Sequence, residues 1–231
     1  MWTLAIETVA TAGSVALLQG DQLVAETILP AETRSAKTLA AAIQNIWHAS
    51  GKPQIELVAV ANGPGSFTGL RVGVISAKTL AYAWRAQLLG VNTLDAIAAQ
   101  VPVENTTNGK LQVVLEAQRQ ELFFATYQAL VKGRWERTAA DEIIATTDWL
   151  TQLQTEQVAG PALKKLREKL PATVQIAADK LCHPRAVTIA HLARERQQSG
   201  AAELWTLLPH YLRVSYAEEG TRGGRRETRE N

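Results

Sequence analysis

The sequence has one cysteine and no long hydrophobic run, and each shortage excludes a class of protein. Cys182 stands alone among 231 residues, so the chain cannot by itself form a disulfide framework or a thiolate metal cluster. No apolar run approaches the roughly 20 residues that span a bilayer. The start of the chain, residues 1–7, lacks the basic segment and the apolar length of a signal peptide. These shortages predict a cytoplasmic protein without a membrane partner.

An excess of charge of one sign is also missing. The 24 Lys and Arg residues nearly balance the 22 Asp and Glu residues, and the net charge of +2 indicates no general affinity for nucleic acid. Hydrophobic residues make up 46% of the chain, which is enough to bury a substantial core. A single large domain and two small lobes both fit this length.

The first hundred residues alternate between strand and helix patterns. Glycine and proline turns separate apolar runs, and the period of each run distinguishes strands from helices. The first three strands follow one another through short turns, which predicts an antiparallel meander. We expect strands over residues 2–6, 13–19, 22–29, 57–61 and 88–91, and helices over residues 35–48, 66–85 and 94–99.

A second series of the same kind begins near residue 101. It predicts strands over residues 111–115, 122–130, 135–139, 157–159 and 174–177, and helices over residues 147–154, 161–170 and 187–198. Both halves therefore open with three strands and continue with helix–strand–helix units. This repetition points to an α/β fold of the actin-like ATPase (ribonuclease H-like) type, in which duplicated βββαβα lobes carry mixed sheets.

The predicted domain boundaries follow from this repetition. The N-terminal lobe spans residues 1–100 and the smaller C-terminal lobe residues 101–204, while residues 205–216 are expected to return to the first lobe. Residues 217–231 mix Glu and Arg with Gly and lack an apolar anchor, which predicts a disordered tail.

A glycine-rich stretch, Asn62 to Gly73, joins the fourth strand to the second helix. Its glycines and proline suit a tight turn, and Ser66 suits a helix N-cap. Inside the helix, small residues recur every four positions and form one bare stripe. The stripe predicts close approach of another backbone, either a partner helix or this chain's own sheet. Its members are Gly69, Gly73, Ala77 and Ala81.

Three segments together resemble the TsaB (YeaZ) family. They are Leu4–Thr8 followed by Gly13–Leu17, then Gly63–Gly73, and finally Pro209–Arg213, and the resemblance covers residues 1–215. It implies the bacterial machinery that places threonylcarbamoyl on N6 of adenosine 37 in tRNAs that read codons beginning with A. In that machinery this family is a non-catalytic subunit, which pairs with its catalytic paralogue TsaD and is assisted by the ATPase TsaE. tRNA is then an indirect partner.

The resemblance also implies where pairing takes place. The family pairs through the first two helices, with itself as a homodimer or with TsaD. Carried onto this sequence, this predicts an interface made of the small-residue stripe and its apolar neighbours. The residues are Leu39, Ile43, Gly69, Leu70, Gly73, Ala77 and Leu80.

The residues themselves offer no catalytic set. The catalytic paralogue holds a metal with a His-x-x-x-His pair, whose spacing puts both rings on one helix face. The histidines here are His48, His183, His191 and His210, and no two are four apart. Ser66 matches a nucleophile elbow only loosely. We expect no catalytic residue and no metal site; the alternative is an autonomous actin-like enzyme, either a small-molecule kinase or a peptidase.

Two further features could bind phosphate. In the actin-like superfamily the opening hairpin cradles a nucleotide, which here would involve Glu7, Thr8, Thr11 and Ser14, with Glu7 holding Mg²⁺ or water. We expect no intrinsic cofactor, with ATP and Mg²⁺ acting within the complex. Two basic faces could touch tRNA phosphate or simply be solvated. Separately, the charged hairpin at 116–121 could lie near the interlobe cleft or be a solvated hairpin. The basic faces are Lys164, Lys165, Arg167 and Lys169, and Arg194 with Arg196.

Overall fold

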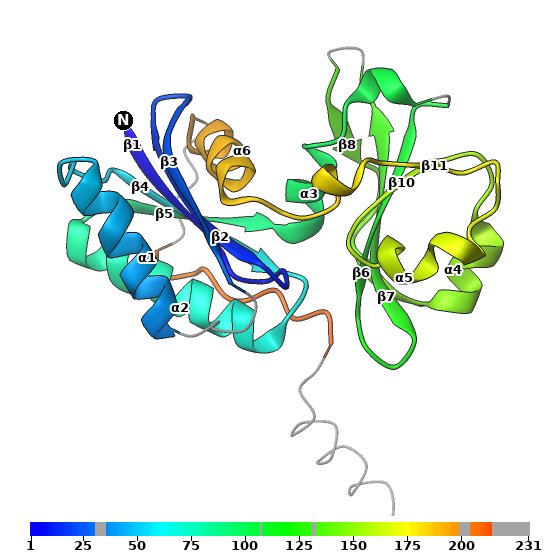
Figure 1. Cartoon of the computed structure of the whole chain (residues 1–231), viewed down its shortest axis with the longest axis horizontal. Coiled ribbons are helices and arrows are strands. Elements are labelled where there is room, and N and C mark those ends of the chain that lie inside the picture. Colours follow the sequence, from blue (N-terminus) through cyan, green and yellow to red (C-terminus); the bar gives the residue numbers. More distant parts are fainter. Residues whose placement is uncertain (31–35, 107, 131–132, 199–203, 214–231) are drawn as a thin grey trace, which may run out of the picture.

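Two lobes stand side by side, each built on one mixed β-sheet (Figure 1). The computed structural model describes residues 1–30, 36–106, 108–130, 133–198 and 204–213. The helix start predicted at residue 35 and the tail predicted over 217–231 lie outside the described residues. Within these residues no helix is long and apolar enough to cross a membrane.

The first sheet has the strand order β3-β2-β1-β4-β5. Strand β2 runs antiparallel to β1 and to β3, whereas β4 and β5 continue parallel to β1. These strands bury nearly every residue of β1, β2 and β4, as expected for a sheet that is covered on both faces. Their bounds are β1 Trp2–Glu7, β2 Gly13–Gln19, β3 Gln22–Leu29, β4 Leu57–Gly63 and β5 Gln87–Asn92.

The second sheet repeats this topology. Its order is β11-β10-β6-β7-β8, with β7 antiparallel to β6, and β10 and β11 parallel to β6. Read from β8, the order matches the first sheet strand for strand, so the predicted duplicated fold is confirmed. The added strand β9, which pairs with β7, was not predicted. The bounds are β6 Lys110–Glu116, β7 Glu121–Ala129, β8 Trp135–Arg137, β9 Glu142–Ala145, β10 Gln157–Ala159 and β11 Gln175–Ile176.

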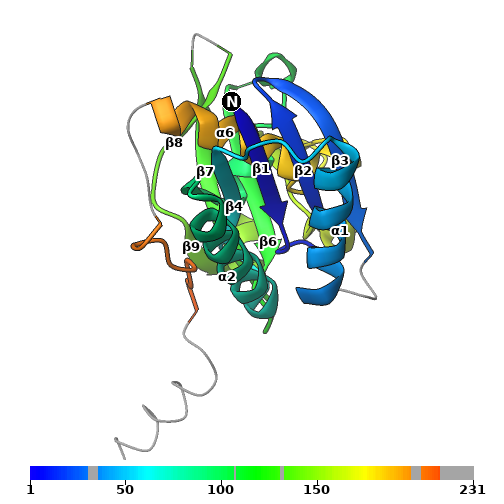
Figure 2. The same ribbon diagram turned by 90° about the vertical axis from the view of Figure 1, so that its left-hand side faces the viewer.

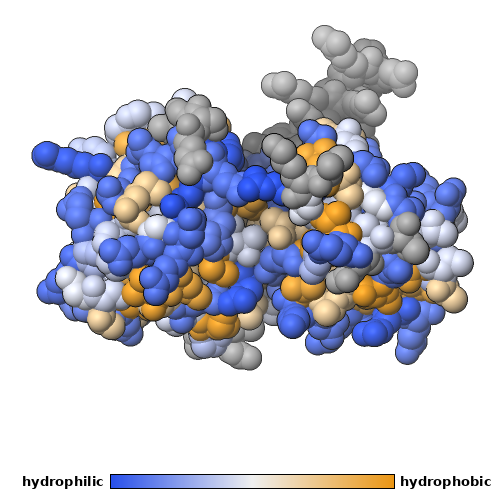
Figure 3. Space-filling model, turned by 90° about the horizontal axis from the view of Figure 1, so that it is seen from above, coloured by the Kyte–Doolittle hydropathy of each residue, from blue (hydrophilic) through white to orange (hydrophobic). Residues whose placement is uncertain are grey.

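Helices cover both faces of the first sheet. Helices α1 (Ala36–Ala49) and α2 (Phe67–Trp84) lie together on one face, and α6 (Ala186–Gln198) lies on the other (Figures 1 and 2). Seen from above, the molecule presents a mostly hydrophilic surface on which hydrophobic residues form small patches over both lobes (Figure 3). The first lobe therefore has two apolar layers, one on each side of its sheet.

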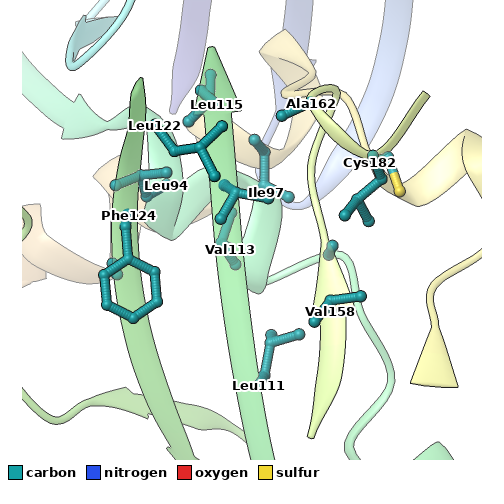
Figure 4. Close-up of a cluster of buried hydrophobic side chains, with 14 of the residues drawn as sticks. Leu94, Ile97, Leu111, Val113, Leu115, Leu122, Phe124, Val158, Ala162 and Cys182 are labelled. Atoms are coloured by element: carbon teal, nitrogen blue, oxygen red, sulfur yellow. The ribbon is translucent and has the colours of Figure 1, made fainter. Parts of the chain in front are cut away.

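The last helix of each half reaches the lobe of the other half: α3 lies between the two lobes, and α6 packs on the first sheet. Leu94 and Ile97 of α3 (Thr93–Ala98) enter the core of the second lobe, where they meet β6 and β7 (Figure 4). Ile189 and Ala190 of α6 pack on the first sheet. The predicted division at residue 100 is therefore wrong for α6, and α3 belongs to both lobes because Ala96 is buried in the first and Leu94 in the second. Periodicity shows that a helix has an apolar face but not which sheet receives it.

The remaining helices of the second lobe are short. The helix predicted through Leu170 is a single α-turn, α5, that continues as a 3₁₀ segment. Beyond α6, residues 204–213 run as an extended segment beside α2, and Leu207 is buried in the first-lobe core. The short helices of the second half of the chain are α4 Thr146–Gln152, α5 Leu163–Leu166, and 3₁₀ turns at Val103–Asn105, Arg167–Lys169 and Asp179–Leu181.

Candidate functional site

The glycine-rich turn at the end of β4 starts helix α2. Ser66 is the N-cap, and its hydroxyl accepts a hydrogen bond of 3.3 Å from the backbone N–H of Gly69. This satisfies one of the amides that a helix leaves without a partner in its first turn. The capping role predicted for Ser66 is confirmed, and its hydroxyl is engaged in the helix start.

The small-residue stripe of α2 faces inward, onto the turn that follows β1. A Cβ added at Gly69 would lie 2.1 Å from the carbonyl oxygen of Thr8, and one added at Gly73 would lie 2.3 Å from the Thr8 hydroxyl. Ala77 is fully buried. Of the two interpretations of the stripe, close packing within the chain is correct, and the prediction that it receives a partner helix is wrong.

The other residues predicted for the interface also belong to the interior. Leu39, Ile43 and Leu70 are buried, and Leu80 is a partly buried residue that packs on the core between α1, α2 and the sheet. Apolar residues on a helix that covers a sheet turn toward that sheet, since burial there stabilises the fold. Any surface offered to a partner must therefore come from the opposite side of these helices.

The outward side of α2 carries two large apolar residues. Ile75 is 64% exposed and Tyr82 is 67% exposed, and their seven-residue spacing puts them on one stripe. The sequence did contain a signal for this exposed apolar pair. It was weaker than the glycine repeat, because two isolated apolar residues on a helix surface are common.

The C-terminal segment is tied along α2. Lys78 Nζ donates to the carbonyl oxygens of Leu207 (3.0 Å) and Trp205 (3.5 Å), and the Trp205 ring meets Tyr82 edge-on at 6.1 Å. Leu208, on the same segment, is 71% exposed. We call the four exposed residues of this surface the α2 apolar face; they are Ile75, Tyr82, Trp205 and Leu208.

The predicted phosphate cradle is closed by its own residues. One carboxylate oxygen of Glu7 accepts hydrogen bonds from the backbone N–H groups of Val9 (2.5 Å) and Ala10 (2.9 Å). The Thr8 hydroxyl donates to the carbonyl oxygen of Gly69, and the Ser14 hydroxyl accepts from the N–H of Ala186 at the start of α6. The Val9 and Ala10 amides and the Thr8 and Ser14 hydroxyls are thus engaged within the chain.

Of the four residues predicted for nucleotide binding, Thr11 alone is exposed. Glu7, Thr8 and Ser14 are buried and hold the turn, the α2 helix and the α6 helix together. The prediction that they form a phosphate site is wrong for these three, because a short polar side chain next to a buried backbone satisfies that backbone first.

A cleft of about 1520 Å³ separates the tips of the two lobes. The β1–β2 turn and the start of α2 line one wall, and the β6–β7 hairpin and the start of α5 line the other. Six basic side chains and one carboxylate, Glu116, line it. The basic residues are Arg71, Lys164, Lys165, Lys180, Arg185 and Arg213.

The hairpin predicted to lie near the cleft does line it. Glu116 pairs with Lys165 across the second lobe at 2.8 Å. The turn itself has three successive residues with positive φ, namely Gln118 at 65°, Arg119 at 50° and Gln120 at 59°. Left-handed conformations cost residues with a Cβ free energy, and this loop holds them with hydrogen bonds between Ala117 and Glu121 and from Thr146 N–H to Gln120.

A polar cluster, of which His210 lines the cleft, joins both lobes to the C-terminal segment. His210 Nε2 lies 3.1 Å from Asp141 Oδ2, and Arg137 reaches both Asp141 and Asp95. Burial opposes ionisation of Asp141, but the hydrogen bond from Asn92 and the charges of Arg137 and His210 outweigh it and hold the pKa of this carboxyl below its usual range. Asp141 therefore keeps its negative charge to a lower pH than an ordinary aspartate does.

The second basic face proposed from the sequence is used inside the molecule. Arg194 pairs with Asp21, and Arg196 donates to the carbonyl oxygen of Gly90, so these side chains fasten α6 to the first lobe. Lys164 and Lys165, by contrast, are exposed at the cleft. The described residues include no group of three or more His, Cys, Asp or Glu that could hold a metal ion.

Comparison with known proteins decides the family. The model of the family TsaD, described as tRNA N6-adenosine threonylcarbamoyltransferase, matches residues 28–219. The chain belongs to this family. Within it, the chain is 29% identical over 230 residues to the tRNA threonylcarbamoyladenosine biosynthesis protein TsaB of Bacillus subtilis, covering 94% of this chain and 96% of that one. It is 30% identical over 146 residues to TsaB of Escherichia coli, covering 62% of each chain.

Solved structures agree with the fold. YeaZ from Pseudomonas aeruginosa superposes with a TM-score of 0.74 at 23% identity, covering 91% of this chain and 99% of that one. The predicted resemblance to the TsaB (YeaZ) proteins is confirmed. The Bacillus subtilis TsaB and the Pseudomonas aeruginosa YeaZ structure each match the chain almost from end to end, so both lobes lie within the matched length.

Proposed function

We propose that this chain serves the synthesis of threonylcarbamoyladenosine in tRNA as a non-catalytic subunit that pairs with a TsaD-type catalytic paralogue. A TsaE-type ATPase assists the pair, and ATP with Mg²⁺ acts within the complex. Membership of the family and the TsaB names of the relatives support the reaction. The α2 apolar face is the observation that carries the pairing.

The residue types favour a supporting role over a catalytic one. The four histidines lie on α1, before and within α6, and on the C-terminal segment, and none is four residues from another. Ser66 caps α2, and Glu7, Thr8 and Ser14 hold the first-lobe turn. Ser66 and the polar residues of the first-lobe turn therefore have structural partners, which supports placing the chemistry on the paralogue.

The α2 apolar face has the character of a protein interface. Ile75, Tyr82, Trp205 and Leu208 are each more than 60% exposed. Tyr and Trp are the residues that most often dominate binding energy at interfaces, since they bury a large area with few rotatable bonds. Neither α1 nor α2 contains Asp or Glu, so this side of the lobe is apolar and weakly basic. The partner surface is then expected to be apolar with an acidic or neutral rim.

Pairing is tested with purified proteins. The chain mixed with a TsaD-type paralogue is expected to elute as a heterodimer, and calorimetry gives its affinity. Ile75→Asp and Tyr82→Asp should each weaken pairing by about tenfold or more, because a charge would be buried against apolar surface. Val24→Asp is the matched control, an exposed apolar residue on the edge strand β3, and it should pair normally. Equal pairing by all three variants would overturn the assignment of the interface.

The supporting role is tested by reconstitution. Paralogue, ATPase, threonylcarbamoyl-adenylate, ATP and unmodified tRNA are combined with and without this chain, and modified adenosine is counted after nuclease digestion. We expect modification to depend on the chain, and we expect none from the chain without the paralogue. Modified adenosine formed by the chain alone contradicts the non-catalytic role, and equal modification without the chain contradicts the role altogether.

A further inference from the structure

We propose that the interlobe cleft binds a single-stranded RNA segment, with phosphates on the lysines of the second lobe and a base on an aromatic platform at Phe67 and Tyr211. The inference rests on the proposed function only in taking tRNA as the source of that RNA. It gives the chain direct contact with the nucleic acid, in place of the indirect contact that the family resemblance implies.

The charge of the cleft is the first argument. Six Lys or Arg side chains line it against the single carboxylate of Glu116, although the chain as a whole is nearly neutral. Three of the six are neutralised, since Lys165 pairs with Glu116, Arg185 with Glu26 and Arg213 with Glu121. Lys164 and Lys180 are exposed, and neither forms an ion pair with another described residue. A cleft lined by one sign of charge concentrates oppositely charged ligands.

The aromatic platform is the second, independent argument. The rings of Phe67 and Tyr211 lie 4.9 Å apart, and the Arg71 guanidinium sits 4.0 Å from the centre of the Phe67 ring. Arg71 Nε also donates to the Tyr211 hydroxyl at 3.2 Å, which fixes the ring. Tyr211 is nevertheless 40% exposed, and all three residues line the cleft. Proteins that bind single strands combine a basic groove with such rings, because every base can stack on them.

The closed turn of the first lobe decides between a strand and a mononucleotide. A nucleotide in a cleft of this fold needs amides and hydroxyls around its phosphates. Here Glu7 engages the amides of Val9 and Ala10, and the hydroxyls of Thr8 and Ser14 bond to Gly69 and Ala186. What remains is a rim of exposed lysines opposite the exposed Tyr211 ring, which is backed by Phe67 at an angle of 34°, on different walls of the cleft. That arrangement suits phosphates and a base spaced along a chain. A duplex keeps its bases stacked inside, so it cannot use the platform.

Fluorescence anisotropy with the full chain tests the site. The probes are a labelled tRNA anticodon stem-loop, the same stem as a blunt duplex, and ATP with Mg²⁺ as a competitor. We expect the stem-loop to bind more tightly than the duplex and to resist the competitor. Displacement of the stem-loop by ATP would mean a mononucleotide site, and equal affinity for the duplex would mean phosphate attraction without the platform; either result overturns the proposal.

Matched variants separate the two parts of the site. Lys164→Glu with Lys180→Glu should weaken stem-loop binding by about tenfold or more and lower the slope of log affinity against log salt by about 1.4, as for two phosphates on a single strand. Lys37→Glu with Lys110→Glu changes the charge equally at exposed sites outside the cleft and should leave binding within about twofold. Tyr211→Ala should weaken the stem-loop but not the duplex, and Tyr211→Phe should restore binding. Equal losses in both lysine pairs, or no loss in Tyr211→Ala, would overturn the assignment.

The same variants keep the inference apart from the proposed function. Circular dichroism first confirms that each variant is folded. Lys164→Glu with Lys180→Glu should still pair with the paralogue, because the cleft lies at the lobe tips and not on the α2 apolar face. A wild-type chain that pairs with the paralogue but does not bind the stem-loop refutes the RNA site and leaves the pairing intact. One that binds the stem-loop without pairing refutes the proposed function alone.

Discussion

The hydroxyl of Thr8 donates a hydrogen bond of 2.8 Å to the carbonyl oxygen of Gly69, so the turn after β1 lies directly against helix α2. Glycine at positions 69 and 73 permits this approach, since a Cβ at either would overlap Thr8. Each helical glycine costs about 1 kcal/mol relative to alanine, and the contact with the turn offsets that cost.

Replacing Gly73 with alanine should therefore destabilise the protein, although alanine favours helix. The new Cβ would lie 2.3 Å from Thr8 Oγ1, and overpacking of this kind costs about 1–3 kcal/mol. Urea unfolding measures the change. Thr8→Ala combined with Gly73→Ala removes the clashing atom, and the double variant should recover part of the loss. No coupling between the two substitutions would show that the stripe does not pack on this turn.

Removal of the α2 N-cap should cost less. Ser66→Ala leaves the Gly69 amide without its side-chain acceptor, which lowers the free energy of unfolding by about 1 kcal/mol. Ser66→Asn supplies an equivalent acceptor and serves as the control. Thermal unfolding followed by circular dichroism distinguishes the two. A loss of the same size in both variants would mean that the hydroxyl acts elsewhere than at the cap.

The cluster around Asp141 should make stability depend on pH in the acid range. Its folded pKa lies below the ordinary value of about 4, so its contribution is complete above that value and is lost as the pH falls through the folded pKa. Asp141→Asn removes this titration and should flatten the acid limb of the curve of unfolding free energy against pH. Glu136→Gln, at a carboxyl on β8, is the comparison. An acid limb unchanged in Asp141→Asn would contradict the assignment.

The buried indole of Trp149 should be sensitive to a conservative change. Its Nε1–H donates to Gln112 Oε1 at 2.8 Å, and both side chains are buried in the second lobe. Trp149→Phe removes the donor and leaves space, with an expected loss of about 2–4 kcal/mol. Adding Gln112→Leu removes the stranded acceptor, so the double variant should be more stable than Trp149→Phe alone. Chemical denaturation of both variants makes the comparison.

Most elements follow from local patterns. The predicted strands 13–19, 22–29 and 157–159 match the structure residue for residue, and the second helix is shorter than predicted by a single residue at each end. Glycine turns and apolar periods act within a few residues, so one chain suffices to locate them. Strand β9 was missed because its four residues adjoin a helix and owe their strand geometry to pairing with β7.

For the candidate site, the sequence predicted less than it did for the fold. The cleft hairpin was placed correctly, because it follows from an element whose position in the repeat is known, whereas the predicted basic helix is a single α-turn from which only Lys164 and Lys165 line the cleft. The predicted roles of Glu7, Thr8 and Ser14 were not correct, since residue type cannot tell whether a hydroxyl or carboxylate meets a ligand or a neighbouring backbone group.

The glycine repeat of α2 shows which properties the sequence determines and which it leaves to the tertiary structure. The sequence by itself determined that something approaches this helix closely, because two glycines and two alanines at four-residue spacing leave one side without side chains. Only the tertiary structure decided that the approaching group is Thr8, and that Ile75 and Tyr82 are left outside. Spacing along a helix defines a face, but the direction of that face depends on contacts with residues some sixty positions away, as in the Thr8–Gly69 hydrogen bond.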